Sequence, residues 1–178
     1  MLLTLEEWTE PRPAAFLDRD GVVIEDRGYL SDPAGIAWVP GSLEAIRRLR
    51  QQGFAPILAT NQSGVGRGMF SQEALDRFHA ALVARLNALE APLAAIAWCP
   101  HGPDEVCECR KPLPGMLEEA FAALPLVREG SFMVGDRLGD VQAGEAAGVR
   151  GLLFEGGNLA HFLTESGVLG CQFLAPER

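Results

Sequence analysis

Long hydrophobic runs and an excess of positive charge are both missing from this sequence. No stretch approaches the ~18–20 consecutive apolar residues that a membrane-spanning helix needs. The first residues include Glu6 and Glu7, acids where a secretory signal would carry bases. The 15 basic and 24 acidic residues give a formal net charge of −9, which argues against a nucleic-acid-binding groove. We expect a cytoplasmic protein that binds neither membranes nor nucleic acid.

Lysine is almost absent, since Lys111 is the single lysine among 15 basic residues. The composition is otherwise ordinary, with 48% hydrophobic and 22% charged residues, which excludes disordered and collagen-like chains. A length of 178 residues suits one domain, 1–178. We expect that domain to be a monomer.

Apolar runs alternate along the chain with stretches of helical periodicity. The apolar runs predict strands at 14–18, 55–60, 93–98, 131–136 and 151–154. The periodic stretches predict helices at 41–52, from 71 onward, at 114–124 and at 141–147, and we expect a further helix and a last strand within 155–178. Residues 22–40 lack either pattern and predict a hairpin or flap. The alternation predicts an α/β fold, an open parallel sheet of Rossmann-like type with helices on both faces.

Acidic and hydroxyl side chains stand where the predicted strands end. Asp18, Thr60 and Asp136 each close an apolar run, and the carboxyl ends of parallel strands meet at one edge of a sheet. Asp20 follows Asp18 by two residues, and Gly21 permits a sharp turn there. Together these acids predict an oxygen-rich pocket for Mg²⁺. The simpler alternative is that Asp18 and Asp20 are ordinary loop acids.

Two further segments suit a phosphate group. Residues 60–63 offer a hydroxyl, amides and backbone N–H groups after a strand, although a polar turn would look the same. Arg110 and Lys111 are adjacent cations before a helix, and the alternative is a solvated basic pair. Asp140 lies at a strand-to-helix turn. It is either a further acid of this pocket or a cap for the following helix.

Three cysteines and a histidine cluster within residues 99–109. These are Cys99, His101, Cys107 and Cys109. Clustered cysteines in a reducing compartment indicate a metal site in preference to disulfides. Three thiolates and one imidazole fill all four positions of tetrahedral zinc, so we expect a structural Zn²⁺ site. The alternative is a set of reduced cysteines without a ligand.

In order, the segments 18–21 (DRDG), 60–64 (TNQSG), 110–112 (RKP) and 135–140 (GDRLGD) resemble the four motifs of the haloacid dehalogenase-like (HAD) phosphohydrolases. The resemblance extends over about 16–154. It implies that Asp18 is the nucleophile, which forms an aspartyl-phosphate, and that Asp20 is the general acid and base. It also implies that Thr60 and Lys111 hold the phosphoryl oxygens. Mg²⁺ would be bound by Asp18, the backbone carbonyl of Asp20, and Asp136.

Within that superfamily the cysteine loop and the following RKP resemble one group. Its members are D-glycero-D-manno-heptose 1,7-bisphosphate 7-phosphatases and histidinol-phosphate phosphatases, which lack a large cap domain. Segments 60–68 and 110–117 are more similar to the heptose enzymes. The spacing between His101 and Cys107 is close to that of the histidinol-phosphate enzymes, and Arg137 stands where the heptose group often has lysine.

The resemblance also implies the substrate contacts, namely Asp26, Arg27, Gly28, Tyr29, Thr60, Asn61, Gln62, Ser63, Arg110, Lys111 and Arg137. It predicts a Mg²⁺-dependent phosphatase that removes the 7-phosphate of a heptose 1,7-bisphosphate on the route to lipopolysaccharide or another surface glycan. A histidinol-phosphate phosphatase is the alternative enzyme. An alternative of another class is a catalytically silent, zinc-stabilised module that binds a phosphorylated ligand.

Overall fold

The structure is a computed structural model that describes residues 1–170. Its centre is a six-stranded sheet in the order β1-β4-β3-β2-β5-β6. The strands are β1 (Leu2–Thr4), β2 (Arg12–Leu17), β3 (Ala55–Asn61), β4 (Ala95–Cys99), β5 (Leu126–Gly135) and β6 (Arg150–Leu153). The five predicted strands are all present, and β5 begins five residues earlier than expected.

The five strands β2 to β6 are parallel to one another, as the alternating pattern predicts. They are apolar on both faces because both faces are covered, and residues Ala14 to Leu17 of β2 are completely buried. The edge strand β1 was not predicted. It pairs antiparallel with β4, with Leu2 opposite Ala97, so the sheet is mixed at that edge.

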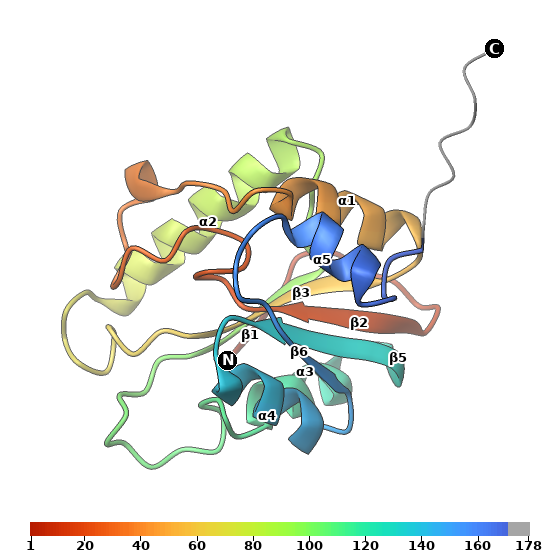
Figure 1. Ribbon diagram of the computed structural model, residues 1–178. Coiled ribbons are helices and arrows are strands. Elements are labelled where there is room, and N and C mark those ends of the chain that lie inside the picture. The colour runs from red at the N-terminus through yellow and green to blue at the C-terminus, as the bar shows by residue number, and fades with distance from the viewer. Residues whose placement is uncertain (171–178) are drawn as a thin grey trace.

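Helices cover both faces of the sheet, which confirms the predicted α/β fold. The helices are α1 (Ser42–Gln51), α2 (Gln72–Ala88), α3 (Gly115–Ala123), α4 (Leu138–Ala146) and α5 (Leu159–Glu165). One face carries α1, α2 and α5, and the other carries α3 and α4 (Figure 1). Each face has its own apolar core, the first around Phe78 and Phe132 and the second around Phe16 and Met116.

Local chemistry explains where two of these helices begin. The Ser71 side chain accepts a hydrogen bond from the backbone N–H of Ala74 and so caps α2. At the start of α4, the Asp140 carboxylate accepts a hydrogen bond from the backbone N–H of Arg137 at 3.0 Å. These two hydrogen bonds fix the starts of α2 and α4, which follow the loops after β3 and β5.

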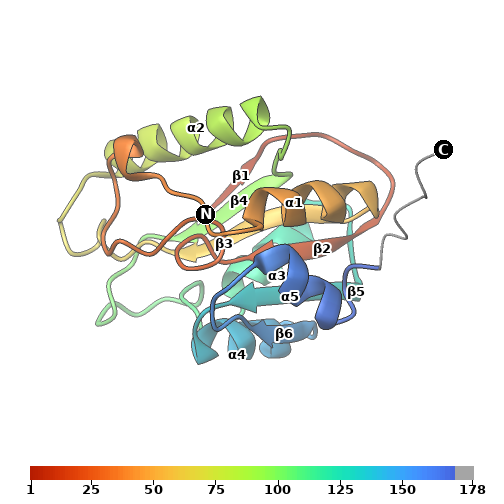
Figure 2. The same cartoon turned by 45° about the horizontal axis from the view of Figure 1, so that its top comes forward.

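The loops that follow β2, β3 and β4 gather at one edge of the sheet (Figure 2). The segment 22–40, which we call the flap, contains one short 3₁₀ helix, Pro33–Gly35, and isolated bridges from Ile24 to Asp20 and Trp38. The expected last strand has no counterpart in 155–170, and 171–178 lie outside the described residues. In the described part of the chain, no helix is long and apolar enough to cross a membrane.

Candidate active site

A pocket of about 340 Å³ lies at the carboxyl edge of the sheet. All of the catalytic and substrate-binding residues expected from the sequence line this pocket except Arg27. The Arg27 guanidinium instead pairs with Glu25 at 2.9 Å, and both side chains are about half exposed. Four further residues line the pocket without having been predicted as site residues, namely Arg19, Gly64, Arg67 and Asp140.

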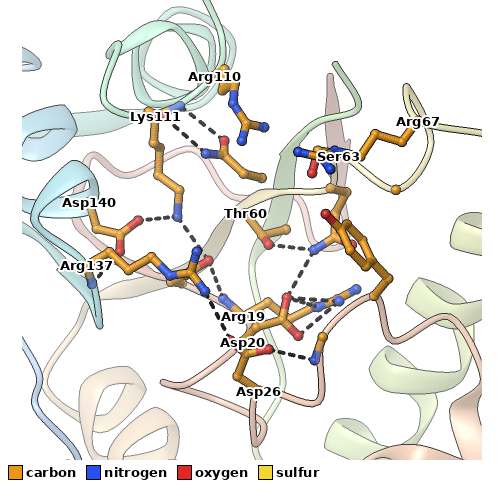
Figure 3. A pocket seen from close by; sticks show the side chains of 16 residues that line it. Arg19, Asp20, Asp26, Thr60, Ser63, Arg67, Arg110, Lys111, Arg137 and Asp140 are labelled. Atoms are coloured by element: carbon orange, nitrogen blue, oxygen red, sulfur yellow. Dashed lines mark hydrogen bonds and ion pairs between the residues drawn. The ribbon is translucent and has the colours of Figure 1, made fainter. Parts of the chain in front are cut away.

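Lys111 is held between two carboxylates at the base of the pocket (Figure 3). Its Nζ lies 3.0 Å from Oδ1 of Asp18 and 2.5 Å from Oδ1 of Asp140. It also donates a hydrogen bond of 2.7 Å to the backbone carbonyl of Ala59 at the end of β3. The three donor positions of the ammonium group are thus all used, and the side chain is buried.

Burial and ion pairing have opposite effects on the pKa values of Asp18 and Lys111. It raises the pKa of Asp18 from 3.8 to about 6, against the opposing effect of Lys111. Burial alone would lower the pKa of Lys111, but Asp18 and Asp140 outweigh it and raise that pKa. Oδ1 of Asp18 pairs with the Lys111 ammonium group and accepts a hydrogen bond of 2.8 Å from the backbone N–H of Arg19. Its Oδ2 has no hydrogen-bond donor among residues 1–170.

Asp136 brings a third carboxylate to Asp18 and Asp140, and oxygen atoms of the three lie within 4.8 Å of one another. The Oδ1 atom of Asp136 is buried and has no hydrogen-bond partner among the described residues. Burial raises the pKa of this carboxyl group. Gly21 makes the approach possible, because it has a φ of +81° and an added Cβ would lie 2.5 Å from Asp136 Oδ2. The nearest cation to this oxygen is the Arg137 guanidinium, whose Nε lies 3.8 Å away. A buried carboxylate oxygen without a hydrogen bond, beside two other acids, fits a hard cation such as Mg²⁺.

The second acid of the DRDG segment, Asp20, is held by its neighbour. The Arg19 guanidinium donates from Nε to Oδ2 and from Nη2 to Oδ1, each at 3.0 Å. Gln62 Nε2 donates to Asp20 Oδ2 at 3.2 Å and to Thr60 Oγ1 at 2.8 Å. Asp20 and the hydroxyl of Thr60 are therefore linked through one amide group.

The polar loop after β3 is fastened to the segment that carries the cations. Asn61 Nδ2 donates to the carbonyl of Lys111, and the N–H of Lys111 donates to Asn61 Oδ1, both at 3.1 Å. The Asn61 side chain thus positions Lys111. Farther out, the Arg67 guanidinium lies 5.8 Å from the centre of the Tyr29 ring. The three glycines within 64–68 indicate a loop. No sequence pattern indicated that Arg67 would line the pocket.

The flap contributes Asp26, whose carboxylate reaches across the pocket mouth. Asp26 Oδ2 accepts a hydrogen bond from Nη2 of Arg137 at 3.1 Å, and its Oδ1 accepts one from the backbone N–H of Gly28 at 2.9 Å. Arg137 is the most exposed of these groups, with 73% of its side chain accessible. It is therefore placed to meet the outer part of a ligand.

The Cys/His cluster forms a compact group next to the pocket. The ligand atoms of Cys99, His101, Cys107 and Cys109 all lie within 4.8 Å of one another. The Nδ1 atom of His101 lies 3.4 Å from the sulfur of Cys99 and 3.3 Å from that of Cys109. Three thiols facing one imidazole nitrogen fit a tetrahedral zinc ion.

This cluster is joined to the pocket walls by backbone hydrogen bonds. The N–H of Gln62 donates to the carbonyl of Cys99 at 2.7 Å, and the N–H of Gly66 donates to that of Pro100 at 2.9 Å. The Arg110 guanidinium donates to the carbonyl of His101 at 3.2 Å. These hydrogen bonds connect the loop 60–68 and the Arg110 side chain to the backbone of the cluster.

Known proteins match this chain over most of its length. A HAD-hydrolase-like family model matches residues 108–166. The D-glycero-beta-D-manno-heptose-1,7-bisphosphate 7-phosphatase of Yersinia pestis is 43% identical over 148 residues, which are 79% of either chain.

Two solved structures are similar as well. One is D,D-heptose 1,7-bisphosphate phosphatase from Bordetella bronchiseptica complexed with magnesium and phosphate. Its TM-score is 0.75 at 40% identity, with 87% of either chain covered. The other is a HAD-like phosphatase from Mesorhizobium loti, with a TM-score of 0.83 at 31% identity over 97% of this chain and 95% of that one.

Proposed function

The chain belongs to the HAD-like hydrolases, and on that premise we propose that it removes the 7-phosphate of D-glycero-D-manno-heptose 1,7-bisphosphate in a Mg²⁺-dependent reaction. The observation that carries the proposal is the meeting of Asp18, Lys111 and Asp136 at the carboxyl edge of the sheet. The substrate follows from relatives that are 40–43% identical and are named for this reaction. The relatives described above give no support to the histidinol-phosphate alternative.

Asp18 is the nucleophile in this proposal. Its Oδ2 lacks a donor while Oδ1 is held by Lys111 and by the backbone, so one oxygen is available to attack phosphorus. The attack forms the Asp18–phosphorus bond as the bond from phosphorus to the sugar oxygen breaks. Thr60 binds the transferred phosphoryl group, and the buried Lys111 compensates its charge from the base of the pocket, because phosphoryl transfer depends chiefly on positioning and charge compensation.

Asp20 is the general acid and base. It gives a proton to the departing sugar oxygen, and the resulting carboxylate then takes a proton from the water that attacks the aspartyl-phosphate. Each turnover returns Asp18 and Asp20 to their starting states. The intact pair also disfavours the silent binding module, which has no need of these acids.

The residues that would hold Mg²⁺ are Asp18, Asp136 and the backbone carbonyl of Asp20. Asp140 is the less suitable ligand, since its oxygens are already engaged by Lys111 and by the N–H of Arg137. When bound, the ion supplies positive charge that screens the substrate phosphate from the Asp18 carboxylate. The orphaned Oδ1 of Asp136 is the feature that fits it.

We assign Cys99, His101, Cys107 and Cys109 to a structural Zn²⁺ site. All four positions of a tetrahedral ion are filled by the chain, so no position remains for substrate. The site acts on the reaction indirectly, by ordering the loop that precedes Arg110 and Lys111. Zinc-bound thiolates also suit the reducing cytoplasm, where we place the protein.

The remainder of the substrate lies under the flap in this proposal. The flap group Asp26, Gly28 and Tyr29 lines the pocket, as do the loop residues Asn61, Gln62 and Ser63. Arg110 and Arg137 are the cations left to meet the second phosphate, since Lys111 is occupied at the base. The whole activity then lies in one monomeric domain, 1–178, with neither a membrane nor a nucleic-acid partner.

The experiment compares phosphate release from both anomers of heptose 1,7-bisphosphate and from histidinol phosphate, each with Mg²⁺ and with EDTA. We expect Mg²⁺-dependent release from a heptose bisphosphate at a kcat/KM at least about 100-fold above that for histidinol phosphate. A preference for histidinol phosphate would overturn the substrate assignment. Release that persists in EDTA would overturn the metal assignment.

A further inference from the structure

Arg19 stands between the two acids of the DRDG segment, yet its side chain is almost completely buried, at 1% exposure. A buried guanidinium is costly unless its charge is balanced and its N–H groups are bonded. Its position in the sequence, directly after Asp18, gives no hint of this burial. Its Nη1 has no hydrogen-bond partner among the described residues, and the contacts of its other two nitrogens indicate what Arg19 does.

Two of the three guanidinium nitrogens of Arg19 hold Asp20. The fork of Nε and Nη2 meets the two carboxylate oxygens at 3.0 Å each, and Nη2 also lies 2.9 Å from Oδ2 (Figure 3). Such a bidentate pair fixes the plane of a carboxylate as well as its distance. Gln62 adds a third hydrogen bond, to Oδ2 at 3.2 Å. The Asp20 carboxyl group is thereby restricted to one orientation.

The guanidinium is itself fixed from two other elements. Its central carbon lies 4.6 Å from the centre of the Phe78 ring on α2, a cation–π contact. Its Nη2 also donates to the carbonyl of Leu30 in the flap at 3.3 Å. Arg19 therefore connects the acid to both the helix layer and the flap.

The pattern of hydrogen bonds leaves one oxygen of Asp20 available for proton transfer. Oδ2 accepts from both Arg19 and Gln62, whereas Oδ1 accepts from Arg19 alone. Oδ1 consequently keeps a lone pair that can carry the transferred proton. The fork determines the direction in which that lone pair points.

We propose that Arg19 is a positioning residue that orients the Asp20 carboxyl group for proton transfer to the leaving oxygen. This inference rests on the proposed function, in which Asp20 is the general acid. In that step the phosphorus–oxygen bond breaks, its electron pair passes to the leaving oxygen, and the proton moves from Asp20 Oδ1 to that oxygen. In this role Arg19 gives up no proton.

Substrates with different leaving groups separate this role from a merely structural one. A sugar alkoxide leaves slowly without a proton, whereas p-nitrophenolate leaves readily without one. The kcat/KM value reports only the steps up to the departure of the leaving group, so the later hydrolysis of aspartyl-phosphate does not enter. We therefore compare kcat/KM for heptose 1,7-bisphosphate and for p-nitrophenyl phosphate.

The variants are Arg19→Lys, which keeps the charge but loses the fork, and Arg19→Met, which loses both. We expect each to lower kcat/KM for the heptose bisphosphate by about 30-fold or more, within the range of a general acid. We expect the value for p-nitrophenyl phosphate to change less than about 3-fold. Arg12→Met removes an arginine that lies outside the pocket and contacts the Trp8 ring, and it should leave both values unchanged.

Asp20→Asn and the double variant Arg19→Met/Asp20→Asn complete the test. If Arg19 acts through Asp20, the double variant is no slower than Asp20→Asn alone by more than about 2-fold. Equal losses on both substrates, or additive losses in the double variant, would overturn the role of Arg19. An Asp20→Asn variant without leaving-group dependence would instead overturn the proposed acid. Thermal unfolding checks that each variant is folded, and Arg19→Lys alone decides the result if Arg19→Met is not.

Discussion

The ammonium nitrogen of Lys111 lies 3.0 Å from Oδ1 of Asp18, and both side chains are buried at the foot of the pocket. The pair leaves Asp18 with a pKa of about 6, well above its ordinary value, because burial outweighs the attraction of the cation. A cation bound beside Asp18 would favour its charged, nucleophilic form. When no cation is bound, the charged Asp18 carboxylate lowers the free energy of unfolding.

Asp18→Asn should therefore stabilise the metal-free protein above pH 6. The folded protein releases the Asp18 proton near pH 6 and the unfolded chain near its ordinary 3.8, so the folded state binds more protons between these values. Stability from this group is present below pH 4 and is lost as pH rises to about 6. Since asparagine cannot ionise, we expect the variant to gain about 1–3 kcal/mol at pH 7.5. Urea unfolding in EDTA measures it, and an equal gain at pH 4 would contradict the burial argument.

Gly21→Ala should weaken Mg²⁺ binding. The added Cβ meets Asp136 Oδ2 at 2.5 Å and also faces a φ of +81°, so the carboxylate must move. Gly53→Ala is the matched control, because Gly53 has a φ of +86° with nothing within 4 Å of an added Cβ. We expect the Mg²⁺ dissociation constant to rise about tenfold or more in Gly21→Ala alone. Calorimetric titration with Mg²⁺ measures it, and identical constants in the two variants would remove Asp136 from the metal site.

Loss of zinc should reduce activity because the loop 99–109 loses its order. The zinc ion itself would take no part in the reaction. Cys109→Ser removes one of the four clustered ligands, and we expect less than one zinc per chain, a lower Tm, and kcat/KM reduced by about tenfold or more. Cys171→Ser changes the remaining cysteine and serves as the control. Metal analysis and thermal unfolding provide the readout. Full zinc content and an unchanged Tm in Cys109→Ser would contradict the structural-zinc assignment.

His79 should limit stability in acid. It is buried on α2, its ring lies 5.3 Å from that of Trp98, and burial with help from Arg19 lowers its pKa to about 4. The unfolded chain binds this proton near pH 6.5, so stability is lost as pH falls from about 6.5 to 4.

We expect His79→Leu to flatten this part of the stability profile. The unsubstituted protein is the reference for this comparison. Chemical unfolding at half-unit pH steps from 4 to 7 gives the two slopes. Parallel profiles for His79→Leu and the unsubstituted protein would show that another group carries the acid sensitivity.

The sequence predicted that polar side chains at strand ends would gather at one edge of the sheet, and the structure places them there. Asp18, Thr60 and Asp136 each follow a buried apolar run, and parallel strands bring such positions to one edge. The single lysine, Lys111, was identifiable by its rarity and by its neighbours. Short or irregular features were harder, and β1 has only three residues, too few for a periodic pattern.

The remaining differences between the sequence predictions and the structure concern the directions in which side chains point. Arg19 follows Asp18 directly, and nothing in the sequence says that its guanidinium turns back onto Asp20. Asp140 suited a helix cap and does accept from Arg137, but its other oxygen pairs with Lys111. Arg27 was expected at the substrate and instead pairs with Glu25 outside the pocket. Such partners depend on tertiary packing, which local patterns do not encode.

The central claim is that phosphate passes through Asp18, and the direct measurement is to find it there. The enzyme is quenched in acid during turnover of heptose 1,7-bisphosphate, and its peptides are analysed by mass spectrometry. The account predicts one hydroxylamine-labile phosphoryl group on the peptide that contains Asp18, and none in Asp18→Asn. A phosphoryl group on another residue, or continued turnover by Asp18→Asn, would contradict it.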